Sequence, residues 1–182
     1  MKNPPKLIAK KTLAKTKVFT IEQLHLQFEN GNEVEYERIY IPPAGAVLIV
    51  PQFDDKTIIL IREYCAGIQR YEIALPKGRV EEGESLVESA NREIMEEIGF
   101  GAKKLEVVKS VSVSPGYMSH QTHIVHATDL YQQKLQGDEP EAIEVLYWDL
   151  NKLDDLINSK EFTEARSIAA LYLLKNQLYG SK

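Results

Sequence analysis

The sequence has very little cysteine: Cys65 is the only one among 182 residues. A single cysteine excludes an internal disulfide and a zinc site built from several cysteines, and it suits a reducing compartment. No stretch approaches the roughly 20 apolar residues of a membrane-spanning helix. The basic start, MKNPPKLIAKKTLAKTK, has no apolar core of signal-peptide length. We therefore expect an unprocessed, soluble protein of the cytoplasm with no membrane partner.

A net positive charge is also absent. The chain has 22 Lys and Arg against 27 Asp and Glu, which gives a formal net charge of −5 at pH 7. No overall field attracts a polyanion, so we do not expect nucleic acid as a partner, and any phosphate site must be built locally. Repeats of 20 to 50 residues are lacking as well, which argues against a solenoid.

The length of the chain fits one globular domain, and the pattern of apolar residues predicts an α+β fold. Alternating residues predict strands at 18–28 and 33–41, joined by a turn at 29–32 into a hairpin. Further strands are expected at 46–53, 57–64, 70–75, 105–113, 122–129 and 143–149, and helices at 85–98, 151–158 and 163–179. We assign residues 1–44 to an N-terminal hairpin subdomain, alternatively a separate small sheet, and residues 45–182 to the main domain.

The predicted helix at 85–98 has clear start and stop signals. Ser85 followed by Glu88 forms a capping box, and Gly99 is placed to end the helix. One face is apolar, while the other carries Glu93, Glu96 and Glu97 on adjacent turns. These carboxylates repel one another and lie at the negative end of the helix dipole. Such a conflict indicates a functional site, and hard cations such as Mg²⁺ or Mn²⁺ prefer carboxylate oxygens.

Residues 78–100 read GRVEEGESLVESANREIMEEIGF. This resembles the motif of the Nudix hydrolases: Gly, five residues, Glu, seven residues, Arg-Glu, an apolar residue, any residue, Glu-Glu, any residue, Gly and an apolar residue. Every specified place is filled, by Gly78, Glu84, Arg92, Glu93, Ile94, Glu96, Glu97, Gly99 and Phe100. A chance match is on the order of 10⁻⁹ per start position from ordinary composition. A merely solvated acidic helix face is thereby dismissed.

The resemblance implies a mixed β-sheet sandwiched between helices and a Mg²⁺- or Mn²⁺-dependent hydrolysis of a nucleoside diphosphate linkage. Glu93 and Glu97 are then the principal metal ligands, with Glu96, Glu84 and the carbonyl of Lys77 as further ligands. Arg92 can pair with Glu96 at the i+4 position and hold the acidic cluster in place.

A general base is expected in the acidic segment GDEPEAIEV at 137–145. The resemblance to ADP-ribose pyrophosphatases of this superfamily implies that a Glu in a loop just before the last core strand takes this role. Glu139 and Glu141 both occupy suitable places, and Glu139 is slightly favoured. The alternative is a solvated acidic loop with no catalytic group.

The substrate must be inferred from sequences outside the motif. Pro115 lies 15 residues after Phe100, within SPGYMSHQTHIV, and this spacing resembles the ADP-ribose pyrophosphatase subgroup. Over nearly its full length the chain resembles the NudE type of bacterial ADP compounds hydrolases, which cleave ADP-ribose, NADH and short diadenosine polyphosphates. The chain departs from the subgroup at Cys65, where Arg is common, and at Ala74 and His120, where Glu is common.

Several residues are candidates for binding an ADP-linked substrate. Arg62 and Lys77 can contact phosphate groups, and Glu72 shares a strand face with Ala74 and can replace the missing acid. Tyr64, Tyr71 or Tyr117 can stack on adenine, with Tyr117 preferred, although strand aromatics more often pack in a core or interface.

The resemblance also implies a homodimer, because N-terminal strands of related pyrophosphatases reach across to a second subunit. An isolated hairpin is barely stable in water, which agrees with such a use of residues 18–41. Two alternatives remain: a Nudix enzyme for a nucleoside triphosphate or capped RNA, and a non-catalytic nucleotide sensor. Sensors usually lose motif carboxylates, and this chain retains all of them.

Overall fold

The computed structural model describes residues 2–179 of the chain and the side chains of residues 2–175. It divides into two compact units, one made of residues 2–45 and 112–121 and the other of residues 46–111 and 122–179. None of the helices in the described part is long and apolar enough to cross a bilayer.

The first unit is built on an antiparallel sheet of three strands: β1 (Lys6–Lys15), β2 (Thr20–Gln27) and β3 (Glu33–Tyr40). The predicted hairpin is confirmed as β2 and β3, which pair from Thr20 with Tyr40 to Gln27 with Glu33. Strand β1 was not predicted. All ten of its residues are exposed, so no buried face imposes the alternation of polar and apolar residues that marks a strand.

The loop at 112–121 joins this first unit through β3. The Ile39 amide donates to the carbonyl of Tyr117 (2.8 Å), and the Ser119 amide donates to the carbonyl of Ile39 (3.2 Å). The Ser119 hydroxyl accepts a further bond from the Ile41 amide (2.8 Å). The predicted Ser-Pro-Gly loop therefore extends the N-terminal sheet unit.

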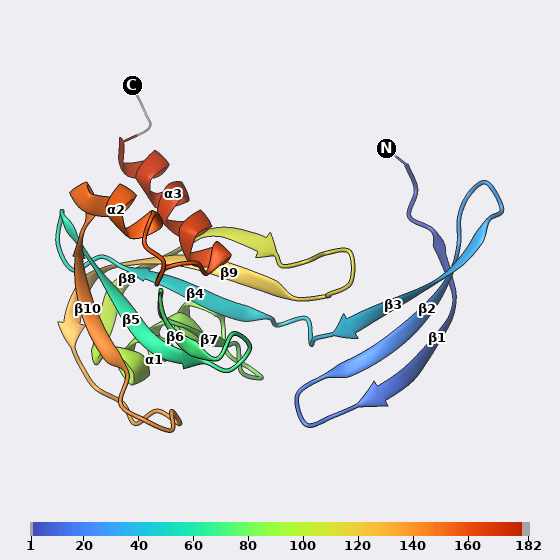
Figure 1. The fold of residues 1–182 in the computed structure, drawn as a ribbon, viewed down its shortest axis with the longest axis horizontal. Coiled ribbons are helices and arrows are strands. Elements are labelled where there is room, and N and C mark those ends of the chain that lie inside the picture. The colour runs from blue at the N-terminus through green and yellow to red at the C-terminus, as the bar shows by residue number, and fades with distance from the viewer. Residues whose placement is uncertain (1, 180–182) are drawn as a thin grey trace. The chain divides into compact units, whose positions relative to one another are not determined.

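The second unit contains two sheets and all the helices, and Figure 1 shows its arrangement. One sheet has the order β10-β5-β6, and the other has the mixed order β7-β4-β9-β8, in which β4 and β9 run parallel. The strands are β4 (Ala46–Pro51), β5 (Thr57–Cys65), β6 (Arg70–Ala74), β7 (Lys77–Arg79), β8 (Phe100–Ser112), β9 (Gln121–Gln132) and β10 (Glu144–Asp149). The helices are α1 (Leu86–Glu97), the 3₁₀ turn η1 (Leu150–Lys152), α2 (Leu153–Ile157) and α3 (Ala165–Tyr179).

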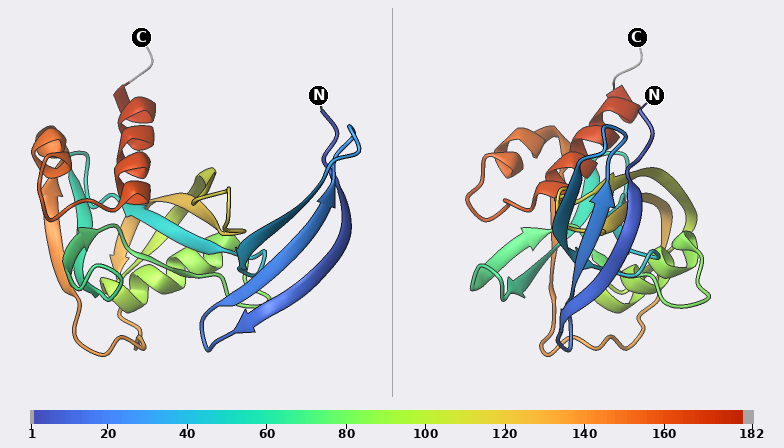
Figure 2. Two further views of the ribbon diagram at one scale, coloured as in Figure 1. Left: turned by 45° about the vertical axis from the view of Figure 1, so that its right-hand side comes forward. Right: turned by 90° about the vertical axis from the view of Figure 1, so that its right-hand side faces the viewer.

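Alternate residues of β4 are buried in two different cores. Val47 and Ile49 pack with α1 through Ile94, whereas Leu48 and Val50 pack with the side of α2 and α3. Because both faces of this strand are covered, its sequence is a continuous apolar run rather than an alternating one. Helix α1 covers one side of the sheets and α2 with α3 covers the other (Figure 2). The predicted α+β fold, with a mixed sheet between helices, is confirmed.

Candidate active site

Helix α1 begins and ends where its sequence signals place it. The Ser85 hydroxyl oxygen accepts a hydrogen bond from the Glu88 amide (3.3 Å), and the Glu88 carboxylate accepts one from the Ser85 amide (2.9 Å). This capping box confirms the prediction. Gly99 has φ +75°, a left-handed conformation that side chains with a Cβ rarely adopt and that ends the helix.

The C-terminal end of α1 has carboxylates and no basic residue in its last turn. The segment after β9 supplies a cation there, because the Lys134 ammonium donates to the carbonyl of Glu96. The next residue, Leu135, donates its amide to the carbonyl of Met95 (3.0 Å). These bonds satisfy carbonyl groups that lack partners within the helix, and they place a positive charge at the negative end of the dipole. Sequence reasoning missed Lys134 because it lies far from α1 along the chain.

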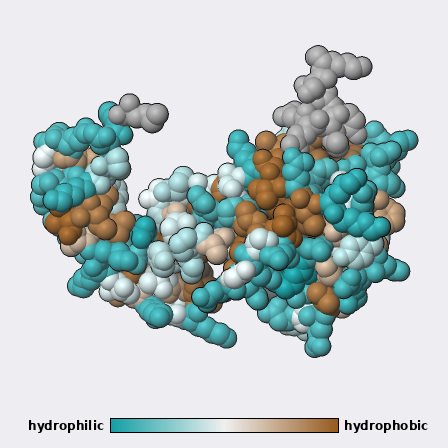
Figure 3. All heavy atoms as spheres, turned by 180° about the vertical axis from the view of Figure 1, so that it is seen from behind, coloured by the Kyte–Doolittle hydropathy of each residue, from teal (hydrophilic) through white to brown (hydrophobic). Residues whose placement is uncertain are grey.

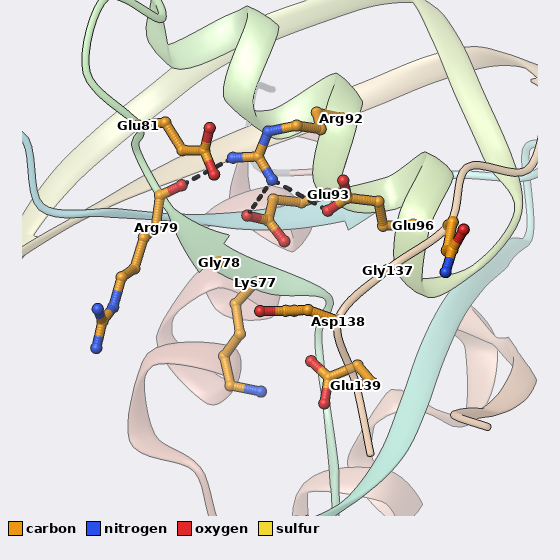
Figure 4. A pocket seen from close by; sticks show the side chains of 11 residues that line it. Lys77, Gly78, Arg79, Glu81, Arg92, Glu93, Glu96, Gly137, Asp138 and Glu139 are labelled. Atoms are coloured by element: carbon orange, nitrogen blue, oxygen red, sulfur yellow. Dashed lines mark hydrogen bonds and ion pairs between the residues drawn. The ribbon is translucent and has the colours of Figure 1, made fainter. Parts of the chain in front are cut away.

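The guanidinium group of Arg92 connects the carboxylates of the motif (Figure 4). Its Nε donates to Glu84 (2.8 Å), and one terminal nitrogen donates to both Glu93 (2.8 Å) and Glu96 (3.0 Å). The pair with Glu96 is the predicted i+4 contact. The hydrogen bond from Arg92 holds the pKa of Glu84 below its usual range. Arg92 also donates to the carbonyl of Arg79 (3.0 Å), which ties the helix to β7.

Two carboxylates of α1 are buried. Glu97 is 5% exposed and accepts a hydrogen bond from the Lys77 amide (3.0 Å). Burial raises the pKa of Glu97 to about 8, because removal from water penalises the charged form. Burial also raises the pKa of Glu93, although the bond from Arg92 opposes this change. A cation placed near these two groups would therefore stabilise their ionised forms.

Gly78 leaves the space that the Glu93 carboxylate occupies. A Cβ atom on residue 78 would lie 1.9 Å from Cδ of Glu93, far inside contact distance. Gly78 is the middle residue of β7, which pairs with β4 through Val47. The first glycine of the motif thus allows a strand and an acidic helix to approach closely.

A pocket of about 870 Å³ opens beside these groups within the second unit. Its lining comes from β7, α1 and the segment before β10 and comprises Lys77, Gly78, Arg79, Glu81, Arg92, Glu93, Glu96, Gln136, Gly137, Asp138 and Glu139. Basic and acidic groups therefore share one cavity, as the binding of a phosphate group together with a cation requires. Arg79 and Asp138 were missed from the sequence. The position of Arg79 directly after the first motif glycine is the signal that could have identified it.

In this structure the carboxylates of the motif accept hydrogen bonds from Arg92 and from the Lys77 amide. Among residues 2–179, no group of three or more His, Cys, Asp or Glu side chains is arranged to hold a metal ion. One nitrogen of Arg92 is bonded to both Glu93 and Glu96, so a cation shared by these two carboxylates would displace it. The donor set is nevertheless suitable, since it offers buried carboxylate oxygens of raised pKa beside an open pocket.

The comparison with known families decides the identity of the chain. The NUDIX domain family matches residues 42–171, and the NudE-type Nudix hydrolase N-terminal domain matches residues 5–38. The chain is a Nudix hydrolase. Members of this family generally use divalent metal ions.

Relatives of this Nudix hydrolase match it along both units. ADP compounds hydrolase NudE of Escherichia coli (strain K12) is 43% identical over 97% of this chain and 94% of its own length. ADP-ribose pyrophosphatase of Bacillus subtilis (strain 168) is 32% identical over 97% of this chain and 100% of its own length. A crystal structure of an ADP compounds hydrolase superposes with a TM-score of 0.92 at 42% identity, covering 99% of this chain and 97% of that one.

Two predicted substrate contacts of the Nudix hydrolase, Arg62 and Glu72, are not among the residues that line the acidic pocket. Arg62 pairs with Glu144 (3.0 Å) and Glu161 (3.2 Å) and lines a neighbouring cavity of about 510 Å³. Glu72 is buried and accepts bonds from the Thr163 amide and hydroxyl, so it fastens β6 to the chain just before α3. Burial opposes ionisation of Glu72, but the bonds from Thr163 prevail and its pKa is lowered. Tyr117 belongs to the first unit.

The structure separates the two candidates for the base. Glu139 lines the acidic pocket, as does Lys77, whose ammonium pairs with Glu63. Burial raises the pKa of Glu139, and the nearby Glu63 and Asp138 add to this effect. Glu141 is not among the residues that line this pocket: it accepts a hydrogen bond from the Tyr71 hydroxyl (2.8 Å) and lines the adjoining cavity, which Glu139 also lines.

Replacement of Gly78 by Ala is expected to reduce kcat about 100-fold with little change in Tm. The new methyl group would push the Glu93 carboxylate aside, and a displacement of about 1 Å at a reacting centre costs about this factor. The fold should survive because only the end of a flexible side chain must move. Gly67→Ala is the control, since a Cβ there meets nothing within 4 Å. Steady-state kinetics and thermal melts would test this, and a Gly78→Ala enzyme of normal kcat would contradict the close packing.

Proposed function

We propose that this Nudix hydrolase cleaves the pyrophosphate linkage of ADP-containing compounds and releases AMP, with Mg²⁺ or Mn²⁺ as its cofactor. The substrates are ADP-ribose, NADH and short diadenosine polyphosphates. The observation that carries the proposal is the 43% identity to an ADP compounds hydrolase over 97% of the chain. The 32% identity to an ADP-ribose pyrophosphatase supports the same substrate class.

The acidic groups on α1 and its flanks supply the cation site. Glu93 and Glu97 are the principal ligands, and Glu96, Glu84 and the carbonyl of Lys77 complete the set. When bound, the cation supplies charge that polarises phosphoryl oxygens and makes water easier to deprotonate. Arg92, already bonded to Glu84, keeps the carboxylates together.

The remaining pocket residues bind the diphosphate and move the proton. Lys77 and Arg79 line the pocket and can donate charge-assisted hydrogen bonds to phosphate oxygens. The water oxygen forms a bond to phosphorus as the bond from phosphorus to the bridging oxygen breaks. Glu139 accepts the water proton, and its raised pKa brings it nearer to the pH at which a general base works best.

Release of AMP is the direct test of this function. ADP-ribose, NADH, diadenosine triphosphate and dATP would each be incubated with the protein and Mg²⁺, and the products separated by chromatography. We expect AMP from the first three compounds and loss of turnover when EDTA is added. Turnover of dATP alone would refute the substrate class, and turnover of none would refute the enzyme function.

The first unit supports a homodimer. This unit exposes apolar side chains, among them Leu7, Ile8, Leu13, Val18, Phe19 and Val34. Figure 3 shows brown, hydrophobic areas on its surface. Exposed apolar surface of this kind favours association, and a second copy of the same sheet is the proposed partner. We expect light scattering at micromolar concentration to give the mass of two 20.7 kDa chains. The mass of a single chain would contradict the dimer.

A further inference from the structure

The segment at 136–143 lies between β9 and β10 in the chain and carries Asp138, Glu139 and Glu141. In space it leads from the C-terminal end of α1 to the start of β10. Its near end is held firmly, because the three residues before it bond to the helix terminus. The Gln133 amide donates to the carbonyl of Gly99 (3.0 Å), and Lys134 and Leu135 bond to the carbonyls of Glu96 and Met95. At its far end Ile143 packs against the apolar core on the α1 side.

Between these ends the segment is held by very little. Within the part of the chain that the structure describes, one hydrogen bond joins residues 136–143 to the rest of the protein. The Tyr71 hydroxyl donates it to a carboxylate oxygen of Glu141 at 2.8 Å. Three carboxylates so close along a loop also repel one another, which favours spreading of the segment. The single bond from Tyr71 therefore acts against both flexibility and charge repulsion.

Tyr71 is itself well fixed. It lies on β6 and pairs with Tyr64 on β5, and the two rings meet edge to face with centroids 5.5 Å apart. A tyrosine ring on a strand has few rotatable bonds, so its hydroxyl offers a defined anchoring point. Tyr71 is 50% exposed, and so the ring is not required to fill a core.

Glu139 and Glu141 lie two residues apart, and only Glu139 lines the acidic pocket, together with Glu93 and Glu96. The adjoining cavity is lined by Tyr71, Glu141 and also Glu139. Glu139 therefore lies where the two cavities meet, and Glu141 fixes the loop two residues further on. Fixing it restricts the directions in which Glu139 can point.

We propose that Tyr71 is a positioning residue: its hydroxyl group, acting through Glu141, holds the segment at 136–143 so that Glu139 faces the acidic pocket. This inference rests on the proposed function in that Glu139 is taken as the base. The bond requires only a donor on residue 71 and an acceptor on residue 141. An amide oxygen can accept it too, although a carboxylate oxygen accepts it more strongly.

Kinetics of four variants test the proposal. Tyr71→Phe and Glu141→Ala are each expected to lower kcat for AMP release about tenfold or more, with a much smaller change in KM. Because both remove the same bond, the double variant should be no slower than the slower single variant. Glu141→Gln should recover much of the activity that Glu141→Ala loses. Tyr147→Phe is the matched control, since Tyr147 is also half exposed on a strand and its hydroxyl makes no hydrogen bond within the described residues.

Amide hydrogen exchange provides a readout that does not depend on activity. Without substrate, Tyr71→Phe should accelerate exchange in peptides covering 136–143 several-fold and leave peptides of α1 unchanged, whereas Tyr147→Phe should change neither. Unchanged exchange in Tyr71→Phe would overturn the proposal, as would a normal kcat or additive losses in the double variant. Failure of the wild-type protein to release AMP would instead refute the proposed function, and the exchange experiment would still decide whether Tyr71 restrains the segment.

Discussion

Replacement of Glu97 by Gln is expected to lower kcat about 1000-fold while the fold is retained. The substitution keeps the shape of a buried side chain and removes the charge proposed to bind the cation. Loss of about 4 kcal/mol of transition-state stabilisation corresponds to this factor, and cation effects on phosphoryl groups are of that size. The Lys77 amide can still donate to the remaining oxygen of residue 97, so the contact between β7 and α1 persists.

A second charge-removing variant in the same motif is the control. Glu82 lies in the exposed turn before α1, at an unspecified place of the motif, so Glu82→Gln should leave kcat near its normal value. Steady-state AMP release with saturating Mg²⁺ measures both variants, and far-ultraviolet circular dichroism checks the fold. A Glu97→Gln enzyme as active as Glu82→Gln would remove Glu97 from the cation site.

In the absence of metal, Glu97→Gln is also expected to change how the free energy of unfolding depends on pH. In the folded protein the pKa of Glu97 is about 8, whereas an unburied glutamate has a value of 4.5. Between these two pH values the folded state retains a proton that the unfolded state has lost. The contribution of Glu97 to the free energy of unfolding therefore falls as the pH rises from about 5 to about 8. Urea unfolding in EDTA should show Glu97→Gln gaining stability relative to wild type across this range, and an unchanged difference would contradict the buried carboxylate.

The features of the site predicted most accurately are those specified by neighbouring residues. Ser85, Glu88 and Gly99 act within one helix, and their roles follow from backbone hydrogen bonding at helix ends. The pairing of Arg92 with Glu96 is likewise set by helical spacing. Because such interactions span three or four residues, the sequence alone determines them.

Contacts between segments that are distant in the chain could not be predicted from such local signals. Tyr71 and Glu141 are 70 positions apart, and their hydrogen bond depends on how β6 and the acidic loop are brought together by the core. Lys134 approaches the end of α1 because the segment that follows β9 is bonded to this helix end, not because of any local signal. Strand β1 was missed for a different reason: a strand exposed on both faces carries no alternating pattern.

Replacement of Glu139 by Gln is the second large effect, with kcat expected to fall between about 100- and 10,000-fold, the usual contribution of a general base. The amide cannot accept the water proton, while its size and its place in the pocket lining are preserved. In the wild-type enzyme, ionisation of Glu139 at its raised pKa contributes to the acidic limb of the kcat profile, and the variant should lose that dependence.

Comparison with Glu141→Gln distinguishes proton transfer from loop position. The amide side chain that this substitution introduces retains an acceptor for the Tyr71 hydroxyl, so we expect the variant to remain far more active than Glu139→Gln. If the reverse is found, Glu141 must leave Tyr71 to reach the water, and the hydrogen bond seen here belongs to a resting arrangement of the loop. Equal losses would mean that the pocket lacks a unique base and that charge along the whole segment at 136–143 assists the reaction. The dependence of kcat on pH, recorded for both variants from pH 5 to 9, separates these outcomes, because only replacement of the true base abolishes the acidic limb.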